Sequence, residues 1–429
     1  MDTREIALAV LMEIETRDTF SNLALTKALK KHQFEEKNER AFLTRLVEGT
    51  MEYKLYLDYV LDQFSKTGIK KCKPLIRSVL RLGAYQILFM DRVPDSAACN
   101  EMVKLTKKHG FQGLSGFVNG VLRALIRGKE HITMPDCKKD PDMYLSVLYS
   151  TPKWLVEKLR RDYGSDVESI LRASYEERKT CIRVQTEKIS KEDLQQRLED
   201  AGIAVQSGHY DEDALLISGY DFIHKIPGYR EGFFLVQDET SMCAVRAAGI
   251  TKGQRIMDVC AAPGGKTTAA AGYAGVEGCV ISMDVAEDKL PLIEENVQRL
   301  GLSNVQIRRN DATEFLAEYE QWADTVIADV PCSGLGIMGR KNDIKYRISR
   351  EQINQLLDLQ QEILEIVHRY VKPGGTLLYS TCTINPEENQ MQIEKFIKQH
   401  SGFRVESSRL FVQGIDQADG FFYAVLKNG

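Results

Sequence analysis

The sequence lacks the features that mark a membrane protein or a disulfide-stabilised secreted domain. No apolar run approaches the roughly 18 residues of a membrane-spanning helix, and the chain starts without the hydrophobic segment of a signal peptide. The nine cysteines are odd in number and include no C-x-x-C pair, which indicates neither a disulfide framework nor a zinc cluster. We therefore expect a cytoplasmic protein that binds no metal, in which a cysteine with a special role is a reactive thiol.

The most informative stretch, Arg255 to Thr268, lacks the two common phosphate-binding signatures. An apolar run ends in Asp258, a Pro-Gly-Gly turn follows, and an alanine-rich segment comes next, which predicts a strand, a tight turn and a helix. The turn does not carry the G-x-G-x-x-G dinucleotide fingerprint, and Cys260 occupies the position of the first glycine of a P-loop. A phosphate cradle would be incomplete here, so the turn suits another ligand.

The length and the charge distribution indicate several domains and an anionic partner. A chain of 429 residues is too long for one ordinary core, and its 43% hydrophobic and 28% charged residues are typical of a globular protein. The net charge is −4, but residues 1–130 contain 22 basic and 16 acidic residues, a net charge of +6 that leaves −10 for the remainder. A polyanion could therefore dock on the first part of the chain.

The spacing of apolar residues divides the chain into modules. Residues 1–130 show the three- and four-residue spacing of helices, and residues 131–150 read as a linker. Residues 151–235 predict a small α+β module, with a helix capped by Thr151 that runs to Tyr163, strands at 180–184 and 214–218, and a second helix led by Ser190. Residues 236–429 alternate apolar strands with helices, which predicts a doubly wound parallel sheet with an antiparallel closing strand. The strands predicted for this last module are 255–260, 279–283, 305–308, 325–329, 376–380 and 421–427.

Three aspartates are expected at the carboxyl edge of that sheet. Asp284 ends the second strand about twenty residues after the glycine turn, where an acid can bind two ribose hydroxyls. Asp311 follows the third strand and Asp329 ends the fourth. Repeated acids repel phosphates and suit a ligand with a ribose, an adenine and a positive centre, which describes S-adenosylmethionine. For any one of these aspartates, a turn or a helix cap is the alternative interpretation.

Three motifs carry a family resemblance. They read Asp258-x-Cys260-Ala261-Ala262-Pro263-Gly264-Gly265-Lys266-Thr267, Asp329-x-Pro331-Cys332-Ser333-Gly334-x-Gly336 and Ser380-Thr381-Cys382-Thr383. Together they resemble the RNA cytosine-5 methyltransferases of the RsmB and NSUN group. Residues 1–130 resemble the NusB-like RNA-binding domain through Arg4 to Leu11, Arg81 to Gln86 and Phe117 to Arg123.

This resemblance implies a multidomain chain with an all-α NusB-like domain, a small α+β module and a Rossmann-like methyltransferase domain. It implies methylation of C5 of a cytosine in small-subunit (16S) ribosomal RNA, with S-adenosylmethionine as the methyl donor. Cys382 would be the nucleophile. The residues implied to line the donor pocket are Cys260, Ala261, Ala262, Pro263, Gly264, Gly265, Lys266, Asp284, Asp311 and Asp329.

Two cysteines suit this chemistry. C5 of cytosine is a poor nucleophile, and addition of a thiolate at C6 makes an enamine whose C5 can attack a methyl group. Cys332 and Cys382 follow neighbouring predicted strands, so both thiols could reach one base, and their spacing alone does not say which attacks. The RNA family implies attack by Cys382 and a part in product release for Cys332. Asp329 would stabilise the charge that develops at N3.

Several neighbouring residues have two interpretations. Lys266 lies in the first turn of its helix, where a cation is unfavourable, which hints at a partner such as Asp329 or a substrate phosphate. The segment 385–388 reads as a helix start that fixes Cys382 rather than as chemistry. The loop 338–342 is either a phosphate contact or plain surface. The same two readings apply to the basic residues Lys66, Lys70, Lys71, Lys73, Arg77, Arg81, Lys104, Lys107 and Lys108.

Other functions compete with methylation of small-subunit RNA. The same catalytic residues would serve methylation of transfer RNA, large-subunit RNA or DNA cytosine. A different class of function is an RNA-binding or antitermination factor with an inactive methyltransferase body, against which the intact cysteines and carboxylates argue. We expect ribosomal RNA as the partner, no membrane, and a monomer.

Overall fold

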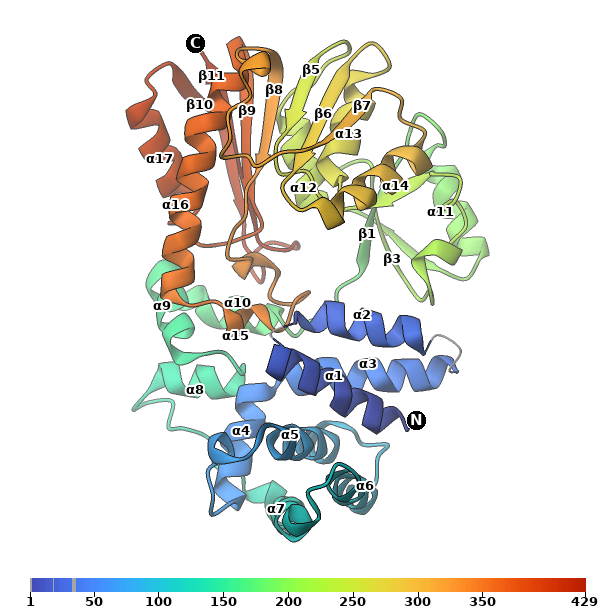
Figure 1. Cartoon of the computed structure of the whole chain (residues 1–429), viewed down its shortest axis with the longest axis vertical. Coiled ribbons are helices and arrows are strands. Elements are labelled where there is room, and N and C mark those ends of the chain that lie inside the picture. The colour runs from blue at the N-terminus through green and yellow to red at the C-terminus, as the bar shows by residue number, and fades with distance from the viewer. Residues whose placement is uncertain (1, 18, 33–35) are drawn as a thin grey trace. The chain divides into compact units, whose positions relative to one another are not determined.

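A computed structural model describes residues 2–17, 19–32 and 36–429 (Figure 1). The chain forms two compact units, which are described separately. One unit holds the residues up to Arg172 together with Met338–Arg347, and the other holds Ala173–Ile337 and Ile348–Gly429. The division predicted above, at residues 130, 150 and 235, cuts the chain differently and remains a prediction about its domains.

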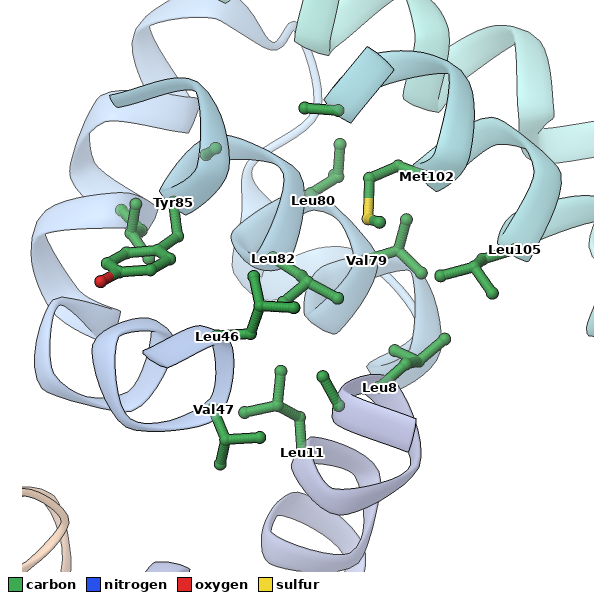
Figure 2. Close-up of a cluster of buried hydrophobic side chains, with 14 of the residues drawn as sticks. Leu8, Leu11, Leu46, Val47, Val79, Leu80, Leu82, Tyr85, Met102 and Leu105 are labelled. Carbon is green, nitrogen blue, oxygen red and sulfur yellow. The ribbon is translucent and has the colours of Figure 1, made fainter. Parts of the chain in front are cut away.

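The first unit is helical throughout its described residues. Its apolar residues face one another across the helices, and Leu8, Leu46, Val79 and Met102 meet in the centre (Figure 2). A glycine allows two helices to approach closely, because a Cβ at Gly49 would overlap the Tyr85 ring. The helices are α1 (Thr3–Arg17), α2 (Ser21–Lys31), α3 (Lys37–Glu52), α4 (Lys54–Phe64), α5 (Pro74–Phe89), α6 (Asp95–Lys108), α7 (Ser115–Gly128), α8 (Pro141–Leu148), α9 (Lys153–Tyr163) and α10 (Val167–Ala173).

Two details differ from the sequence-based expectation for this region. The predicted linker contains the helix α8, whose N-cap is Asp140, a residue that accepts a hydrogen bond from the Met143 N–H at 2.9 Å. Thr151 was expected to cap α9, but its hydroxyl donates to the Tyr149 carbonyl at 2.7 Å, and the helix begins at Lys153.

A segment from the last third of the sequence also belongs to the first unit. The short helix α15 (Ile344–Arg347) buries Lys345, and the hydroxyl of Tyr346 lies 2.8 Å from the Ser150 hydroxyl. Asp343 accepts a hydrogen bond from the Ser21 N–H at 2.9 Å. The loop 338–342 therefore leads directly into a buried anchor, although Arg340 and Lys341 themselves are exposed.

The second unit contains two sheets. The smaller one is antiparallel with the order β2-β3-β1-β4, and the helix α11 (Lys191–Asp200) begins after the N-cap Ser190, as predicted. Its strands are β1 (Thr180–Val184), β2 (Ala204–Ser207), β3 (Ala214–Ser218) and β4 (Phe234–Val236). The strands β1 and β3 have the predicted bounds.

The larger sheet has seven strands in the order β10-β11-β9-β8-β5-β6-β7 (Figure 1). The four consecutive pairs from β9 to β7 are parallel, and β11 runs antiparallel to β9, which confirms the predicted closing strand. The order reverses at β5, which places the glycine turn at the switch point where open sheets bind ligands. The strands are β5 (Arg255–Asp258), β6 (Cys279–Asp284), β7 (Val305–Arg309), β8 (Ala323–Asp329), β9 (Val371–Thr381), β10 (Phe403–Phe411) and β11 (Phe421–Asn428).

Helices cover both faces of this sheet because side chains alternate along each strand. Met257 and Tyr379 face α16 (Arg350–Val367) and α17 (Gln390–Gln399). Ile256 and Leu378 face α12 (Glu239–Ala247) and α13 (Gly265–Ala274). The helix α14 (Leu290–Leu300) packs through Ile293 against the glycine turn. These layers fix the strand ends that carry the site.

Candidate active site

The glycine turn joins β5 to α13. Gly264 is the N-cap of α13 and has a φ of 98°, a conformation that side-chain-bearing residues rarely adopt. A Cβ at this position would lie 3.2 Å from the Cγ2 of Ile293. The turn therefore needs glycine both for its backbone conformation and for its packing, and it leaves the first N–H groups of α13 at the ligand-binding edge.

Asp284 is tied directly to this turn. One carboxylate oxygen accepts the Ala262 N–H at 3.0 Å, and the other accepts the Ala286 N–H at 3.0 Å. Asp311 is partly buried and uses one oxygen to accept from the N–H and hydroxyl of Thr313. Both aspartates therefore accept hydrogen bonds within local turns, as the alternative interpretation expects. Asp284 is the last residue of β6 and Asp311 follows β7, so both lie at the carboxyl edge of the sheet.

Asp258 is the most buried acid of the turn. It has no exposed surface, and the Thr267 hydroxyl donates to one of its oxygens at 2.7 Å. Burial raises the pKa of Asp258 to about 7, and the nearby Asp329 and Asp284 raise it further against the lowering effect of Thr267 and Lys266. Its other oxygen has no hydrogen-bond partner within the described ranges.

Lys266 and Asp329 form an ion pair with a separation of 2.7 Å. The side chain of Lys266 is 10% exposed, so this cation is largely shielded from water. The hydroxyl of Ser380 donates to the second oxygen of Asp329 at 2.7 Å. The local partner expected for Lys266 is therefore Asp329, and the pair joins the turn after β5 to the end of β8.

The two cysteine sulfurs lie 3.4 Å apart. Because β8 and β9 are parallel neighbours, the segments that follow them bring Cys332 and Cys382 together, as the sequence predicts. Both residues are half-buried. The pKa of the Cys332 thiol is well above its ordinary value because of its hydrogen bond with Cys382, burial, and the charges of Cys382 and Glu388.

Backbone contacts lock the two cysteine segments together. The N–H of Gly336 donates to the Cys382 carbonyl at 3.1 Å, and the hydroxyls of Ser333 and Thr383 lie 2.7 Å apart. The carboxylate of Glu388, which is fully buried, accepts from the Ser333 N–H at 2.8 Å. The position of one thiol therefore depends on the segment that carries the other.

The segment 385–388 was predicted to start a helix, and this prediction is wrong in detail. The helix α17 begins at Gln390, because the side chain of Asn385 instead accepts from the Glu387 N–H within a separate turn. The expectation that this segment is scaffold for Cys382 agrees with the contacts of Glu388. A buried glutamate cannot be told from a capping glutamate by its spacing alone.

Arg183 is a site residue that the sequence reasoning missed. Arg183 belongs to no motif and to no basic cluster of the sequence. Its guanidinium donates to the Gly265 carbonyl at 3.1 Å and to the Thr268 hydroxyl at 3.0 Å. Arg183 is 4% exposed, and burial lowers its pKa to about 10. The small sheet thereby supports the first turn of α13. Only a tertiary contact reveals this role.

The basic residues of the first unit fall into two groups. Arg81 is 7% exposed and pairs with Asp58 at 2.7 Å, and Arg77 pairs with Glu15. These two arginines therefore form ion pairs within the unit. The interpretation of Arg81 as an RNA contact is therefore wrong. Four lysines remain exposed at the start of α5 and before it, namely Lys66, Lys70, Lys71 and Lys73.

Among residues 2–17, 19–32 and 36–429, no three or more His, Cys, Asp or Glu side chains gather as a metal site would require. In the same ranges no helix is long and apolar enough to cross a bilayer.

Sequence families match all three parts of the chain. The family described as 16S rRNA methyltransferase RsmB/F matches residues 249–427, the NusB family matches residues 1–127, and the ferredoxin-like domain of RsmF/B-like methyltransferases matches residues 151–221. The first and third matches confirm the Rossmann-like methyltransferase and α+β assignments, and the second confirms the NusB-like one.

Individual relatives agree with the family matches. A probable ribosomal RNA small subunit methyltransferase B from Bacillus subtilis is 36% identical over 94% of this chain and 90% of its own length. The ribosomal RNA small subunit methyltransferase B of Proteus mirabilis is 31% identical over 90% of each chain. A crystal structure of a protein called PH0851 superposes with a TM-score of 0.85 at 26% identity, over 99% of each chain.

A methyltransferase homologue from Pyrococcus horikoshii has a TM-score of 0.59 at 25% identity, over 66% of this chain and 98% of its own. The predicted donor, S-adenosylmethionine, agrees with these matches, and the residues at the glycine turn fit it, because the carboxylates of Asp284, Asp311 and Asp329 at the strand ends suit a ligand with a ribose and a positive centre. The chain belongs to the ribosomal RNA small subunit methyltransferase B family, and it is an S-adenosylmethionine-dependent RNA methyltransferase.

Proposed function

We propose that this enzyme methylates C5 of one cytosine in small-subunit ribosomal RNA through a covalent bond between Cys382 and C6 of the base. The observation that carries the proposal is the 3.4 Å separation of the Cys332 and Cys382 sulfurs at the ends of adjacent strands. Two thiols beside a donor turn suit a reaction that needs both an attacking group and a group for release. The names of the relatives support the RNA substrate.

The attack is assigned to Cys382. The raised pKa of Cys332 keeps that residue a thiol at neutral pH, and a thiol can donate its S–H to a neighbouring thiolate. Attack of the Cys382 sulfur on C6 forms the C6–S bond and places electron density on C5. Later the C5 proton leaves to a base, the C6–S bond breaks, and its electron pair returns to Cys382. Cys332 takes part in this release.

Asp329 and Lys266 stabilise the base during the attack. Addition at C6 develops negative charge at N3, and Asp329, once it has taken up a proton, would neutralise that charge by sharing the proton with N3. Lys266 lies 2.7 Å from Asp329 and keeps a positive charge beside the ring. The Ser380 hydroxyl fixes the other carboxylate oxygen, so the acid presents one orientation. These contacts support a role at N3.

The residues proposed to hold the donor are Cys260 to Lys266, Asp284, Asp311 and Asp329. S-adenosylmethionine supplies an electrophilic methyl group when it is bound there. The chain orients the donor with the backbone of the glycine turn, which Asp284 fixes through the Ala262 N–H. The buried, largely acidic surroundings also raise the pKa of Cys260, which therefore remains a neutral thiol.

The test combines turnover with trapping of the covalent adduct. Purified protein and isotopically labelled donor should methylate deproteinised small-subunit RNA at a cytosine. Cys382→Ala should abolish turnover, whereas Cys332→Ala should accumulate a protein–RNA adduct that survives denaturation. Full activity in Cys382→Ala would remove the nucleophile assignment, and transfer or large-subunit RNA as the better substrate would remove the substrate assignment.

We also propose a role for each domain of the chain. Residues 1–130 are proposed to hold RNA, with residues 131–150 as a linker, residues 151–235 as the α+β module and residues 236–429 as the catalytic domain. The exposed lysines near the start of α5 supply positive charge for RNA phosphates. We expect the enzyme to act as a cytoplasmic monomer. Loss of a single 5-methylcytosine from ribosomal RNA in a deletion strain would support the whole assignment.

A further inference from the structure

Glu388 is a buried acid that the proposed chemistry does not use. Its exposure is 0%, although it lies next to the two partly exposed cysteine segments. The donors to its carboxylate are neutral groups, namely the Ser333 N–H and hydroxyl and the side chains of Asn385 and Gln360. A carboxylate with no exposed surface is costly unless its hydrogen bonds compensate, so its presence here needs an explanation.

The contacts of Glu388 bracket Cys332 on both sides. One oxygen accepts the N–H of Ser333 at 2.8 Å, directly after Cys332, and also accepts from the Gln360 amide at 3.1 Å. The same amide donates to the carbonyl of Pro331 at 2.9 Å, directly before Cys332. The backbone that carries the Cys332 thiol is therefore held at both neighbours.

The other oxygen of Glu388 reaches the Cys382 segment. It accepts from the Ser333 hydroxyl and, at 2.9 Å, from the amide of Asn385. Because Ser333 donates to Glu388, the hydroxyl of Thr383 must donate to Ser333 across their 2.7 Å contact. Thr383 directly follows Cys382, and its oxygen also accepts the Asn385 N–H at 3.1 Å.

The helices and strands behind Glu388 are themselves hydrogen-bonded to it. Its main-chain carbonyl accepts the hydroxyl of Tyr379 at 2.7 Å, which attaches it to β9. The side-chain amide of Gln392 donates to the side-chain amide oxygen of Gln360 at 3.2 Å, which joins α17 to α16. The carboxylate thus sits in a rigid frame, and rigid support of a reacting group is what precise placement requires.

We infer that Glu388 is a positioning residue whose carboxylate sets the placement of the Cys332 thiol relative to Cys382, and so controls release of the covalent adduct. The inference rests on the proposed function, because it presumes that Cys382 attacks and Cys332 assists release. Its negative charge also contributes to the raised pKa of Cys332. Loss of the carboxylate should therefore impair release more than it impairs attack or donor binding.

Glu388→Gln keeps the shape of the side chain but replaces one acceptor oxygen by a donor NH₂ group. The Ser333 N–H can only donate, so the remaining oxygen stays with it, and the NH₂ group must face the Ser333 hydroxyl and Asn385. Turnover should fall roughly tenfold or more, as is typical for loss of a hydrogen bond to a charged group. The fraction of enzyme trapped on RNA should rise, while the affinity for the donor stays within about twofold.

Glu387→Gln is the matched control. Glu387 directly precedes Glu388 in the sequence, but its carboxylate pairs with Arg350 and its side chain is 24% exposed. It should match the wild type in turnover and in trapped adduct. Ser333→Ala is the second variant, which removes only the hydroxyl link and should shift turnover and trapping in the same direction by a smaller factor. It keeps the inference testable if Glu388→Gln does not fold.

The outcomes separate the two proposals. If Cys332→Ala traps an adduct but Glu388→Gln matches Glu387→Gln in both readouts, the positioning role is wrong and the proposed function stands. If Cys332→Ala traps none, Cys332 has no part in release, and the inference falls together with that part of the proposed function. Loss of donor binding in Glu388→Gln together with normal turnover in Ser333→Ala would reduce Glu388 to general support of the fold and overturn the inference.

Discussion

Arg81 in the helical unit and Asp258 at the carboxyl end of β5 are both almost fully buried, yet their charges are compensated in different ways. Arg81 pairs with Asp58 at 2.7 Å and lies 3.6 Å from Glu15, so the interior of the helical unit is locally balanced. Asp258 has a hydroxyl donor and a raised pKa of about 7. The buried charge of Arg81 is balanced by its neighbours, which favours stability, whereas Asp258 is a buried group whose protonation can change near neutral pH.

The largest effect is expected for a residue at the carboxyl ends of the strands, and it is an effect on activity and not on stability. Cys382→Ala should lower turnover at least about a thousandfold, because the proposed covalent route loses its nucleophile. The half-buried side chain is small, so the free energy of unfolding should change by less than about 1 kcal/mol. Methyl transfer and urea denaturation measure the two quantities. A large loss of stability would erase the contrast between the two regions.

The opposite result is expected for Arg81→Ala. Removal of the guanidinium leaves Asp58 without its paired cation, while Glu15 keeps Arg77, and breaking such a buried pair typically costs about 3–5 kcal/mol. Urea denaturation should show this loss, while the folded fraction keeps its donor affinity. Lys104→Ala is the control, since the exposed pair with Glu101 should contribute less than about 1 kcal/mol. Equal stability of the two variants would contradict the assignment of Arg81 to the interior.

Asp258→Asn should change the dependence of stability on pH. The folded-state pKa is raised from 3.8 to about 7, so between these values the folded protein holds a proton that the unfolded chain has released. The stabilising contribution of this group is therefore complete below about pH 4 and is lost as the pH rises to about 7.

Asparagine does not titrate, so the stability of the wild type relative to Asp258→Asn should fall across that window, by on the order of a few kcal/mol. Urea denaturation at several pH values measures the difference. A constant difference from pH 4 to pH 7 would show that Asp258 has an ordinary pKa, and the contrast with the helical unit would then lose its electrostatic basis.

The smallest effect is expected for Arg183→Gln. Arg183 supports the glycine turn through the Gly265 carbonyl, so its loss should weaken donor binding by roughly tenfold, the equivalent of one hydrogen bond to a charged group. Calorimetric titration with S-adenosylmethionine measures the affinity. Arg197→Gln, which alters an exposed arginine in the same part of the chain, is the control. Unchanged affinity in Arg183→Gln would confine Arg183 to packing.

The sequence predicted those parts of the fold whose signals are local. The strands β5, β6 and β8 are apolar runs that end in an acid, and β9 ends directly before Cys382. The strand β7 is more polar and is followed by Asp311, and the sequence predicted all five strands, although β9 begins at Val371, earlier than predicted. The strand β10, Phe403–Phe411, was missed because its middle residues are exposed and polar, as an edge strand allows.

The candidate site was predicted in the same uneven way. Cys332, Cys382 and the Lys266–Asp329 pair follow from strand ends and a motif, because parallel neighbours bring strand ends together. Glu388 and Arg183 depend on contacts between segments that are far apart in the sequence. Spacing cannot show that a glutamate faces inward, or that an arginine meets a glycine carbonyl.

The segment Met338–Arg347 has a consequence for the order in which the protein is completed during synthesis. The helical unit includes this segment, and the Ser150 hydroxyl that receives the Leu55 N–H at 2.9 Å also meets the Tyr346 hydroxyl at 2.8 Å. The first 172 residues leave the ribosome long before Tyr346 does. The helical unit can therefore complete its fold only after the segment Met338–Arg347 has been synthesised.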